Sequence, residues 1–464
     1  MLWNPLAGLC GLLFCSMMAL IFVSSVRRSS FGWLILFIEY FYVLGLGVFP
    51  LLLSVGVIDA PQLAVDYESQ NGELAVATFV HIFLYGLGAL FGYFGARPLA
   101  RKVSLRVASF AADSKINNYA WFYIVSGLSI LFSGLYFNIM GLENAVVNAS
   151  FARGGDFSRI GGFEQYQFLK TLAMIGVFSM VFVPYIIIDG KHIKSTFLII
   201  ALVAFLFYLL NVSRTVFFDT LVLFTILYLI FGRFNFGSII YSIVIFLFII
   251  FVFWFGKGFV YALSVYLFGG GDLDLIVQNE SASAIFFGQF GFLVYSIDAG
   301  IRNFFSHGPL LSQDVLLSPL GFLPSFAYSA VGLDFLSYQL VDQSECLSCI
   351  NTQYFSYDDC TIPPHFMGVS AYLLPVVGGF FFGFVRFFIY SVIEISWMRL
   401  RDYPKLLWVP LFLLFIAHRL MLFIPGTISF AFFVLVALLF ILKLRKVVRV
   451  DNPPSSALTS AVQR

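Results

Sequence analysis

Long apolar segments alternate with short polar ones along this chain, and the alternation predicts membrane-spanning helices. About 20 apolar residues are needed to cross a hydrocarbon core of roughly 30 Å. Because lipid offers the backbone no hydrogen-bond partners, each span is expected to be a helix. The segments that fit are residues 5–26, 31–58, 74–96, 119–140, 166–188, 196–211, 215–232, 238–255, 366–389, 406–424 and 427–442. The predicted fold class is an all-α polytopic membrane protein of about eleven transmembrane helices.

The predicted spans divide the chain into four parts. Residues 1–256 hold the first eight spans, residues 366–442 hold the last three, and residues 443–464 form a basic tail. The cap interval between them, residues 257–365, carries ten acidic residues against two basic ones. Its Gly, Pro and Tyr content predicts short helices and turns on one side of the membrane. Within the cap, residues 284–301 are partly apolar and form either a re-entrant or interfacial helix or one further span.

Composition and charge indicate the class of protein and its orientation. The chain is 61% hydrophobic and 11% charged, which excludes a soluble globular protein. Under the positive-inside rule the predicted spans place 18 of the 26 Lys and Arg residues in the cytoplasm. The N-terminus is then outside and the C-terminus inside, with the first helix retained as a signal anchor. With an acidic cap and a net charge of +2, no nucleic-acid partner is expected.

Eight basic residues lie away from the predicted cytoplasmic segments: Arg153, Arg159, Lys170, Arg214, Lys257, Arg302, Arg386 and Arg419. Arg419 falls within the tenth predicted span, where a charge is costly and usually faces a cavity, an ion pair or a polar ligand. An ion pair with a carboxylate such as Asp219 is the alternative to a ligand. Arg386 is expected near the inner interface, where snorkelling explains it. Arg214 and Lys170 are either functional or simple interfacial anchors.

Other polar groups allow fewer conclusions. Within the spans, Glu39 and His81 either pack as polar pairs or line a cavity. Three cysteines in the cap resemble, together with His365, the Cys3His spacing of a zinc site: Cys346, Cys349 and Cys360. In an oxidising compartment a disulfide is favoured over zinc, with the pairing undetermined and one thiol left over. We therefore predict neither a metal site nor a cofactor.

Several short patches occur in order along the chain. They are NVSRTVFFDTLVLF at 211–224, FLPSFAY at 322–328, IPPHFMG at 362–368, VVGGFFFGFVRFF at 376–388 and AHRLMLF at 417–423. Together with the large cap before the ninth predicted span, this layout resembles the Wzy-type O-antigen and oligosaccharide repeat-unit polymerases of bacterial inner membranes. The resemblance covers most of the chain as a layout, and the order of the patches carries it.

The resemblance implies a membrane glycosyltransferase that uses no nucleotide sugar. A growing glycan on polyprenyl diphosphate would be transferred at the periplasmic face to an incoming lipid-linked repeat unit, with a flippase and a chain-length regulator (a polysaccharide co-polymerase) as partners. Arg214 and Arg419 would hold the diphosphate, and Asp298 or His365 would act as a general base. The further substrate-binding residues would be Lys170, Arg153, Arg159 and Arg302.

Other functions are open alternatives. An O-antigen ligase would use the same donor but deliver the glycan to a lipid A core. A transporter or flippase of lipid-linked oligosaccharide would need discontinuous helices and a cavity reachable from both sides. A structural scaffold would leave the charge of Arg419 within a span unexplained. The large cap on one side of the membrane favours the polymerase.

Overall fold

The computed structural model describes residues 5–113, 116–146, 149, 167–211, 214–232, 282–310, 330, 332, 347–355, 364–421 and 434. Every element in these ranges is an α-, 3-10 or π-helix, and they contain no strand. Among them, seven helices are long and apolar enough to cross a membrane. The chain is therefore an all-α polytopic membrane protein, as its hydrophobic pattern predicts.

Six of the seven helices coincide with predicted spans one to six: Pro5–Arg28, Phe31–Ser54, Val76–Gly95, Asn118–Met140, Leu169–Asp189 and Ile193–Leu210. The seventh, Val377–Leu400, begins eleven residues later than the ninth span predicted at 366–389, because the start of that segment forms a separate helix, His365–Leu373. The seventh and tenth predicted spans are also helical, as α12 (Arg214–Phe231) and α20 (Trp408–Met421). The spans predicted at 238–255 and 427–442 lie outside the described residues, as do most of the cap and the basic tail. The total of eleven stays a prediction.

The chain forms two compact units that are not continuous in sequence. The first consists of Met1–Ala112, Glu280–Arg399 and Leu413–Arg464, and the second of Asp113–Asn279 and Leu400–Phe412. The cap helix and the ninth predicted span therefore pack with the first three spans, from which more than 180 residues separate them in the chain.

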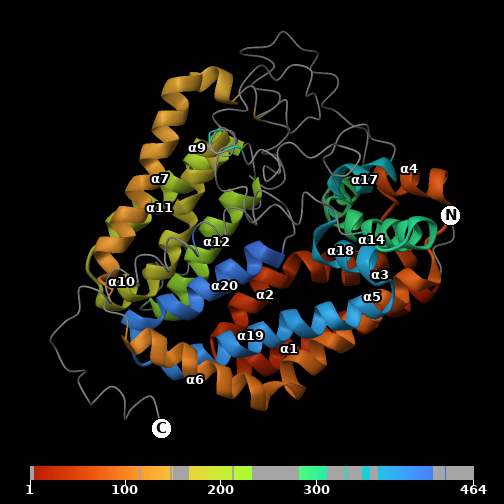
Figure 1. The fold of residues 1–464 in the computed structure, drawn as a ribbon, viewed down its shortest axis with the longest axis horizontal. Helices are drawn as coiled ribbons and strands as arrows, with labels where there is room; N and C mark the ends of the chain where they lie inside the picture. The colour runs from red at the N-terminus through yellow and green to blue at the C-terminus, as the bar shows by residue number, and fades with distance from the viewer. Residues whose placement is uncertain are drawn as a thin grey trace. The chain divides into compact units, whose positions relative to one another are not determined.

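The described residues of the first unit include four of the seven candidate spans, with shorter helices at their ends (Figure 1). The spans are α1 (Pro5–Arg28), the succession α2 (Phe31–Tyr42), π-helical η1 (Val43–Val48) and α3 (Phe49–Ser54), then α5 (Val76–Leu90) with π-helical η2 (Phe91–Gly95), and α19 (Val377–Leu400). The shorter helices are α4 (Gln62–Asn71), α6 (Arg97–Asp113), α17 (Leu347–Gln353) and α18 (His365–Leu373).

Small residues allow α5 and α19 to pack backbone to backbone. A Cβ added to Gly88 would lie 2.0 Å from the carbonyl oxygen of Phe380, and one added to Gly92 would lie 2.2 Å from that of Phe384. Gly383 of α19 faces the Tyr85 carbonyl just as closely. Glycines four residues apart on facing helices are a common device for close packing in membranes. This contact fixes α19, which carries much of the candidate site.

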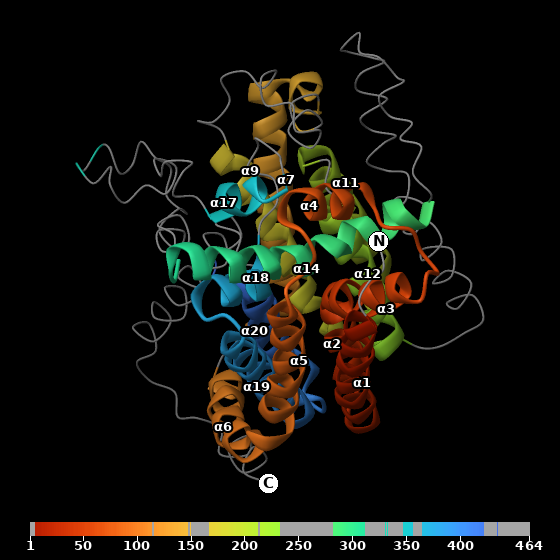
Figure 2. The same ribbon diagram turned by 90° about the vertical axis from the view of Figure 1, so that its right-hand side faces the viewer.

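The cap helix α14 (Ala282–His307) runs across the spans rather than along them. Figure 2 shows it nearly at right angles to α1, α5 and α19. Its packing is tight, since a Cβ on Gly45 of η1 would lie 2.6 Å from the Phe290 carbonyl. α14 is not among the seven candidate spans. Residues 284–301 were expected to form either a re-entrant or interfacial helix or one further span. The orientation of α14 matches the first alternative.

The basic segment after the third span is itself a helix, α6. Its buried positions recur at helical spacing, as Ala100, Ser104 and Ala108. Ala100 packs against Val392 and Ile395 near the end of α19. In both figures α6 lies at the end of the spans that is remote from α14. Sequence analysis identified this segment only by its charge.

The second unit contains α7 (Asn118–Met140), α9 (Gln167–Ala173), the 3-10 helix η5 (Met174–Phe182), α10 (Val183–Asp189), α11 (Ile193–Asn211) and α12. Asn117 caps α7, since its side-chain oxygen accepts hydrogen bonds from the backbone N–H groups of Tyr119 and Ala120. The Ser129 hydroxyl donates to the Ala173 carbonyl at 2.5 Å and so ties α7 to the fifth span.

Candidate functional site

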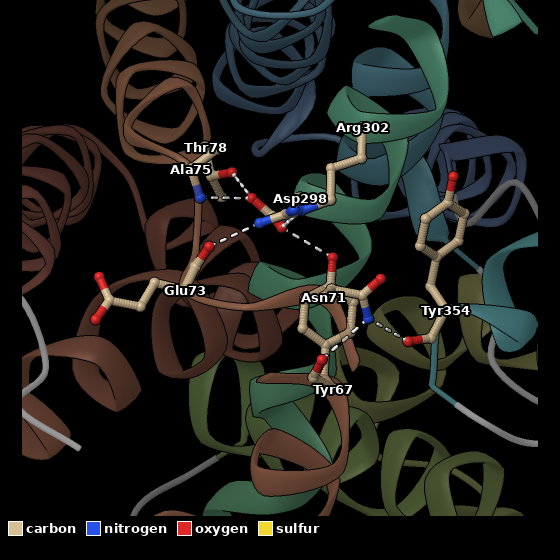
Figure 3. A network of polar contacts seen from close by, with 8 residues as sticks. All are labelled: Tyr67, Asn71, Glu73, Ala75, Thr78, Asp298, Arg302 and Tyr354. Carbon is tan, nitrogen blue, oxygen red and sulfur yellow. Dashed lines mark hydrogen bonds and ion pairs between the residues drawn. The ribbon is translucent and has the colours of Figure 1, made fainter. Parts of the chain in front are cut away.

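Asp298 of α14 is the centre of a buried polar network, drawn in Figure 3. Its Oδ1 accepts hydrogen bonds from the backbone N–H of Ala75 at 2.8 Å and from the Thr78 hydroxyl at 2.6 Å. Its Oδ2 accepts from the Tyr67 hydroxyl at 2.9 Å and from Nε of Arg302 at 2.6 Å. The carboxylate is fully buried. One side chain thus joins the cap helix to α4 and to the start of α5.

Arg302 and Asn71 extend this network. Arg302 lies one helical turn after Asp298, and its Nη2 donates to the Glu73 carbonyl at 2.7 Å. The Asn71 amide donates to the Tyr354 carbonyl at 2.8 Å. The link between the second and third spans is therefore fastened to α14, and the segment after α17 is fastened to the end of α4.

The geometry assigns Asp298 a structural role and does not support the expectation that it is a general base. A carboxylate has about four lone-pair positions, and four donors already occupy those of Asp298. Burial alone would lower the pKa of Arg302, but the hydrogen bond and the charge interaction with Asp298 outweigh burial and raise that pKa above its ordinary value. Arg302 therefore stays protonated. Arg302, expected to bind substrate, has the same fastening role through its Nε and Nη2 atoms.

A second buried charge pair joins α2 and α19 inside the first unit. Arg386 donates to Oε1 of Glu39 through Nε at 2.8 Å and Nη2 at 2.6 Å, and the Tyr390 hydroxyl donates to the same oxygen at 2.6 Å. The guanidinium lies over the Tyr42 ring, 4.3 Å from its centroid. Nη1 of Arg386 and Oε2 of Glu39 are buried and have no hydrogen-bond partner in the described part of the chain.

The expectation that Arg386 snorkels to the inner interface is wrong. Arg386 is 0% exposed and pairs with Glu39. It is the tenth residue of the 24-residue span, so at 1.5 Å per residue it lies near the middle of the helix. Of the two interpretations of Glu39, a packed polar pair and a residue that lines a cavity, the structure supports the packed pair. The same holds for His81, whose Nε2 is 2.8 Å from the Ser370 hydroxyl.

His365, one of the predicted catalytic residues, is close enough to Arg386 for the charge of the arginine to act on its ring. His418 of α20 is within electrostatic range of Arg386, His365 and Arg419, and Arg419 is 6% exposed. We call these four residues the basic cluster. These residues are held by α18, α19 and α20. Because Arg386 is paired with Glu39, the guanidinium of this cluster that suits a phosphate group is that of Arg419, since guanidinium binds phosphate oxygens in pairs.

His365 begins α18 in an unusual conformation. Its φ of 55° lies in the left-handed region, which non-glycine residues seldom adopt and which often marks functional sites. The ring packs between Phe41 and Phe292, with centroid distances of 5.5 and 5.3 Å. Burial, reinforced by the charge of Arg386, lowers the pKa of His365 to about 4. The imidazole is therefore neutral at physiological pH and able to accept a proton.

The other predicted site residues are not brought to this cluster by the described contacts. Lys170 is half-buried in α9 of the second unit, and Arg214 is the first residue of α12 in that unit, with a side chain outside the described set. Arg153 and Arg159 lie wholly outside the described residues.

The cysteines of the cap follow the disulfide interpretation at the one position described. Cys349, in α17, is disulfide-bonded, and its partner lies outside the described residues. Cys10 and Cys15, in α1, are free thiols. Within the described ranges no three His, Cys, Asp or Glu side chains are grouped closely enough to hold a metal ion.

Sequence reasoning missed His418 and the pairing of Glu39 with Arg386. One usable signal was Tyr390, which stands one turn after Arg386 and so presents a hydroxyl on the same helix face. Comparisons with protein-family models, with curated proteins and with solved structures found no match to this chain.

Proposed function

We propose that this chain is a bacterial inner-membrane glycosyltransferase that polymerises lipid-linked oligosaccharide repeat units at the periplasmic face. The observation that carries the proposal is the basic cluster: His365 and Arg419 come from two separate patches of the sequence resemblance, both are buried, and both act electrostatically on His418. A polytopic membrane protein with buried arginines suits a substrate that is itself anchored in lipid and carries a diphosphate.

The basic cluster supports a division of roles in the transfer. Arg419 binds the diphosphate of the polyprenyl donor and stabilises the negative charge that develops on it as the sugar–phosphate bond breaks. The diphosphate oxygen leaves with the electron pair of that bond. The acceptor hydroxyl oxygen bonds to the anomeric carbon, and its proton passes to neutral His365. Arg386 is committed to Glu39 and raises the positive potential without leaving its partner.

Two further observations agree with the proposed orientation. The disulfide at Cys349 fits an oxidising compartment for the cap. The pair of arginines that ends α1 and the basic residues of α6 lie together at the end of the spans remote from α14, as the positive-inside rule expects of a cytoplasmic face. A flippase that delivers the repeat units and a chain-length regulator would be its partners.

The test is the surface-polysaccharide ladder of a strain that lacks this gene, resolved on a gel. The deletion is expected to leave a core with a single repeat unit, and the wild-type gene should restore the ladder. Arg419→Ala and Arg419→Lys should not restore it, whereas Arg401→Ala, at an exposed arginine that pairs with Asp402, should. Protein levels in the membrane must be equal in all strains.

The outcomes separate the alternatives. A bare core, with polymer accumulating on the lipid carrier, would identify a ligase instead. An unchanged ladder in the deletion strain would reject both glycosyltransferase functions. Full restoration by Arg419→Ala would remove this arginine from the site while leaving the function open to other residues.

A further inference from the structure

Three rings from three helices of the first unit pack against one another at the start of α18. The centroid of the His365 ring lies 5.5 Å from that of Phe41, on α2, and 5.3 Å from that of Phe292, on α14. The two phenyl rings are 5.8 Å apart. Each distance is within the range of an aromatic contact. The imidazole is therefore held by two helices other than its own.

The two nitrogens of this imidazole have different surroundings. Nδ1 is buried and has no hydrogen-bond partner in the described ranges of the chain. Nε2 makes no hydrogen bond within those ranges either, but it is not fully buried, and the residue as a whole is 8% exposed. Nε2 is therefore the ring nitrogen that a substrate can reach.

The backbone of His365 depends on these contacts. Its φ of 55° is unfavourable for a residue that carries a β-carbon. Such a conformation persists only where the surrounding structure determines it. The two phenyl rings supply that constraint at the side chain, and they leave one orientation of the imidazole.

The charged groups that face the ring come from α19 and α20. The charge of Arg386 acts on His365, and His418 lies within electrostatic range of it. The carboxylate of Glu39, on α2, already holds Arg386. Among the described residues, no Asp or Glu oxygen lies within 4.0 Å of the His365 ring. An imidazolium would have no counter-charge here, so these surroundings favour the neutral ring.

We propose that Phe41 and Phe292 are positioning residues, which fix His365 so that the lone pair of Nε2 faces the acceptor hydroxyl while Nδ1 carries the hydrogen of the neutral ring. Nε2 takes the hydroxyl proton, and the electron pair of the O–H bond stays on the oxygen that bonds to the anomeric carbon. This inference rests on the proposed glycosyltransferase function and adds to it the reacting atom and the two side chains that aim it.

Nuclear magnetic resonance of the full-length protein in detergent micelles tests the positioning without an activity assay. Histidine is labelled with ¹⁵N and ¹³C, and the spectrum of His365→Asn identifies the His365 signals. At pH 7 we expect the ¹⁵N shifts of a neutral ring that is protonated on Nδ1. In Phe41→Leu and in Phe292→Leu, the midpoint of the His365 titration should rise by about one pH unit or more, because water reaches the ring.

The chain offers a matched control and a second route. Phe304→Leu removes another half-buried phenyl ring of α14, twelve residues after Phe292, and should leave the His365 titration as in the wild type. Because Phe41 and Phe292 lie on different helices, either leucine variant keeps the test valid if the other does not fold.

The pH profile of polymerisation shows whether this positioning serves the reaction. Purified protein in phospholipid vesicles is given lipid-linked repeat units extracted from the strain that lacks this gene. Phe41→Leu should lower the rate at pH 7 roughly tenfold, because the base is misplaced. Its acidic limb should move to higher pH together with the His365 midpoint. Phe41→Tyr keeps the ring and should retain most of the activity.

Two results would overturn the positioning role: a neutral ring protonated on Nε2, or midpoints in both leucine variants equal to that of the wild type. A midpoint that moves in Phe41→Leu while the acidic limb stays in place would also reject it, since His365 would then not be the base. If the wild type polymerises nothing, the proposed function and the base role fail together, whereas shifted midpoints would still assign Phe41 and Phe292 to holding the ring.

Discussion

Arg386 directs two of its three guanidinium nitrogens at a single oxygen of Glu39, at 2.8 and 2.6 Å. A bidentate pair would use both carboxylate oxygens. Here the Tyr390 hydroxyl shares Oε1 as a third donor, and Oε2 is left without a partner in the described chain. The pair therefore cross-links α2 and α19 at the depth of the basic cluster, and both charges are fully enclosed.

Removing only one member of this pair should be far more damaging than removing both. Arg386→Met leaves the Glu39 carboxylate buried without compensation, which is expected to lower the free energy of unfolding by about 3–5 kcal/mol. The double variant Glu39→Leu, Arg386→Met should recover most of that loss. Unfolding in mixed detergent micelles gives the measurement. Additive effects of the two changes would show that the side chains do not act as a pair.

Asp298 should behave as a structural residue. Asp298→Asn removes the charge that Arg302 needs and should lower the free energy of unfolding by about 2–3 kcal/mol. Thr78→Val deletes one neutral hydroxyl from the same carboxylate and should cost about 1 kcal/mol. In the polysaccharide assay, any loss with Asp298→Asn should follow the loss of folded protein. Inactive but fully stable Asp298→Asn protein would instead restore the general-base role.

The helices that could be predicted from the sequence are those whose formation depends on a continuous apolar segment of the chain. The span at Pro5–Arg28 is a continuous apolar run, and its existence follows from the cost of burying polar groups in lipid. The all-α class follows for the same reason. The orientation of α14, nearly at right angles to the spans, could not be predicted from the sequence, because residues 284–301 are only partly apolar. Its direction is decided by contacts with α5 and η1, which no periodicity encodes.

For the candidate site, sequence reasoning reached single residues but not their partners. Arg419 was identified because a charged side chain within a span is costly and usually has a polar partner or a ligand. Arg386 was misassigned because its span was predicted to begin at residue 366, whereas the helix begins at Val377. Its partner Glu39, 347 residues away along the chain, could not be inferred from sequence. Asp298 is an acid in a cap of many acids, and only the positions of Tyr67 and Thr78 reveal its role.

The close crossing of α5 and α19 should not tolerate a methyl group. Gly88→Ala places a Cβ 2.0 Å from the Phe380 carbonyl oxygen, so the helices must separate, at a cost of about 1–3 kcal/mol. Gly134→Ala in α7 is the matched control, since a Cβ there meets nothing within 4 Å. Helix propensity predicts that this control is stabilised by up to about 1 kcal/mol. Equal melting temperatures for the two variants would contradict the crossing.

His365 should make the protein less stable as the pH falls. Burial lowers its pKa to about 4 from an ordinary value of 6.5, with the charge of Arg386 as the second cause. Between these two values the unfolded chain binds a proton that the native state does not. The free energy of unfolding should therefore decrease as the pH falls from 6.5 to about 4, by at most about 1.4 kcal/mol per pH unit.

The variant His365→Asn tests this pH dependence, because asparagine tolerates the left-handed backbone conformation at this position better than most residues. Melting curves between pH 7 and pH 4 should have a shallower slope in the variant than in the wild type. His307→Asn, at an exposed histidine in the last turn of α14, controls for the loss of a histidine as such. If the slopes of wild type and His365→Asn coincide, the imidazole titrates alike in the folded and unfolded chains, and a neutral His365 can no longer be assigned as the proton acceptor.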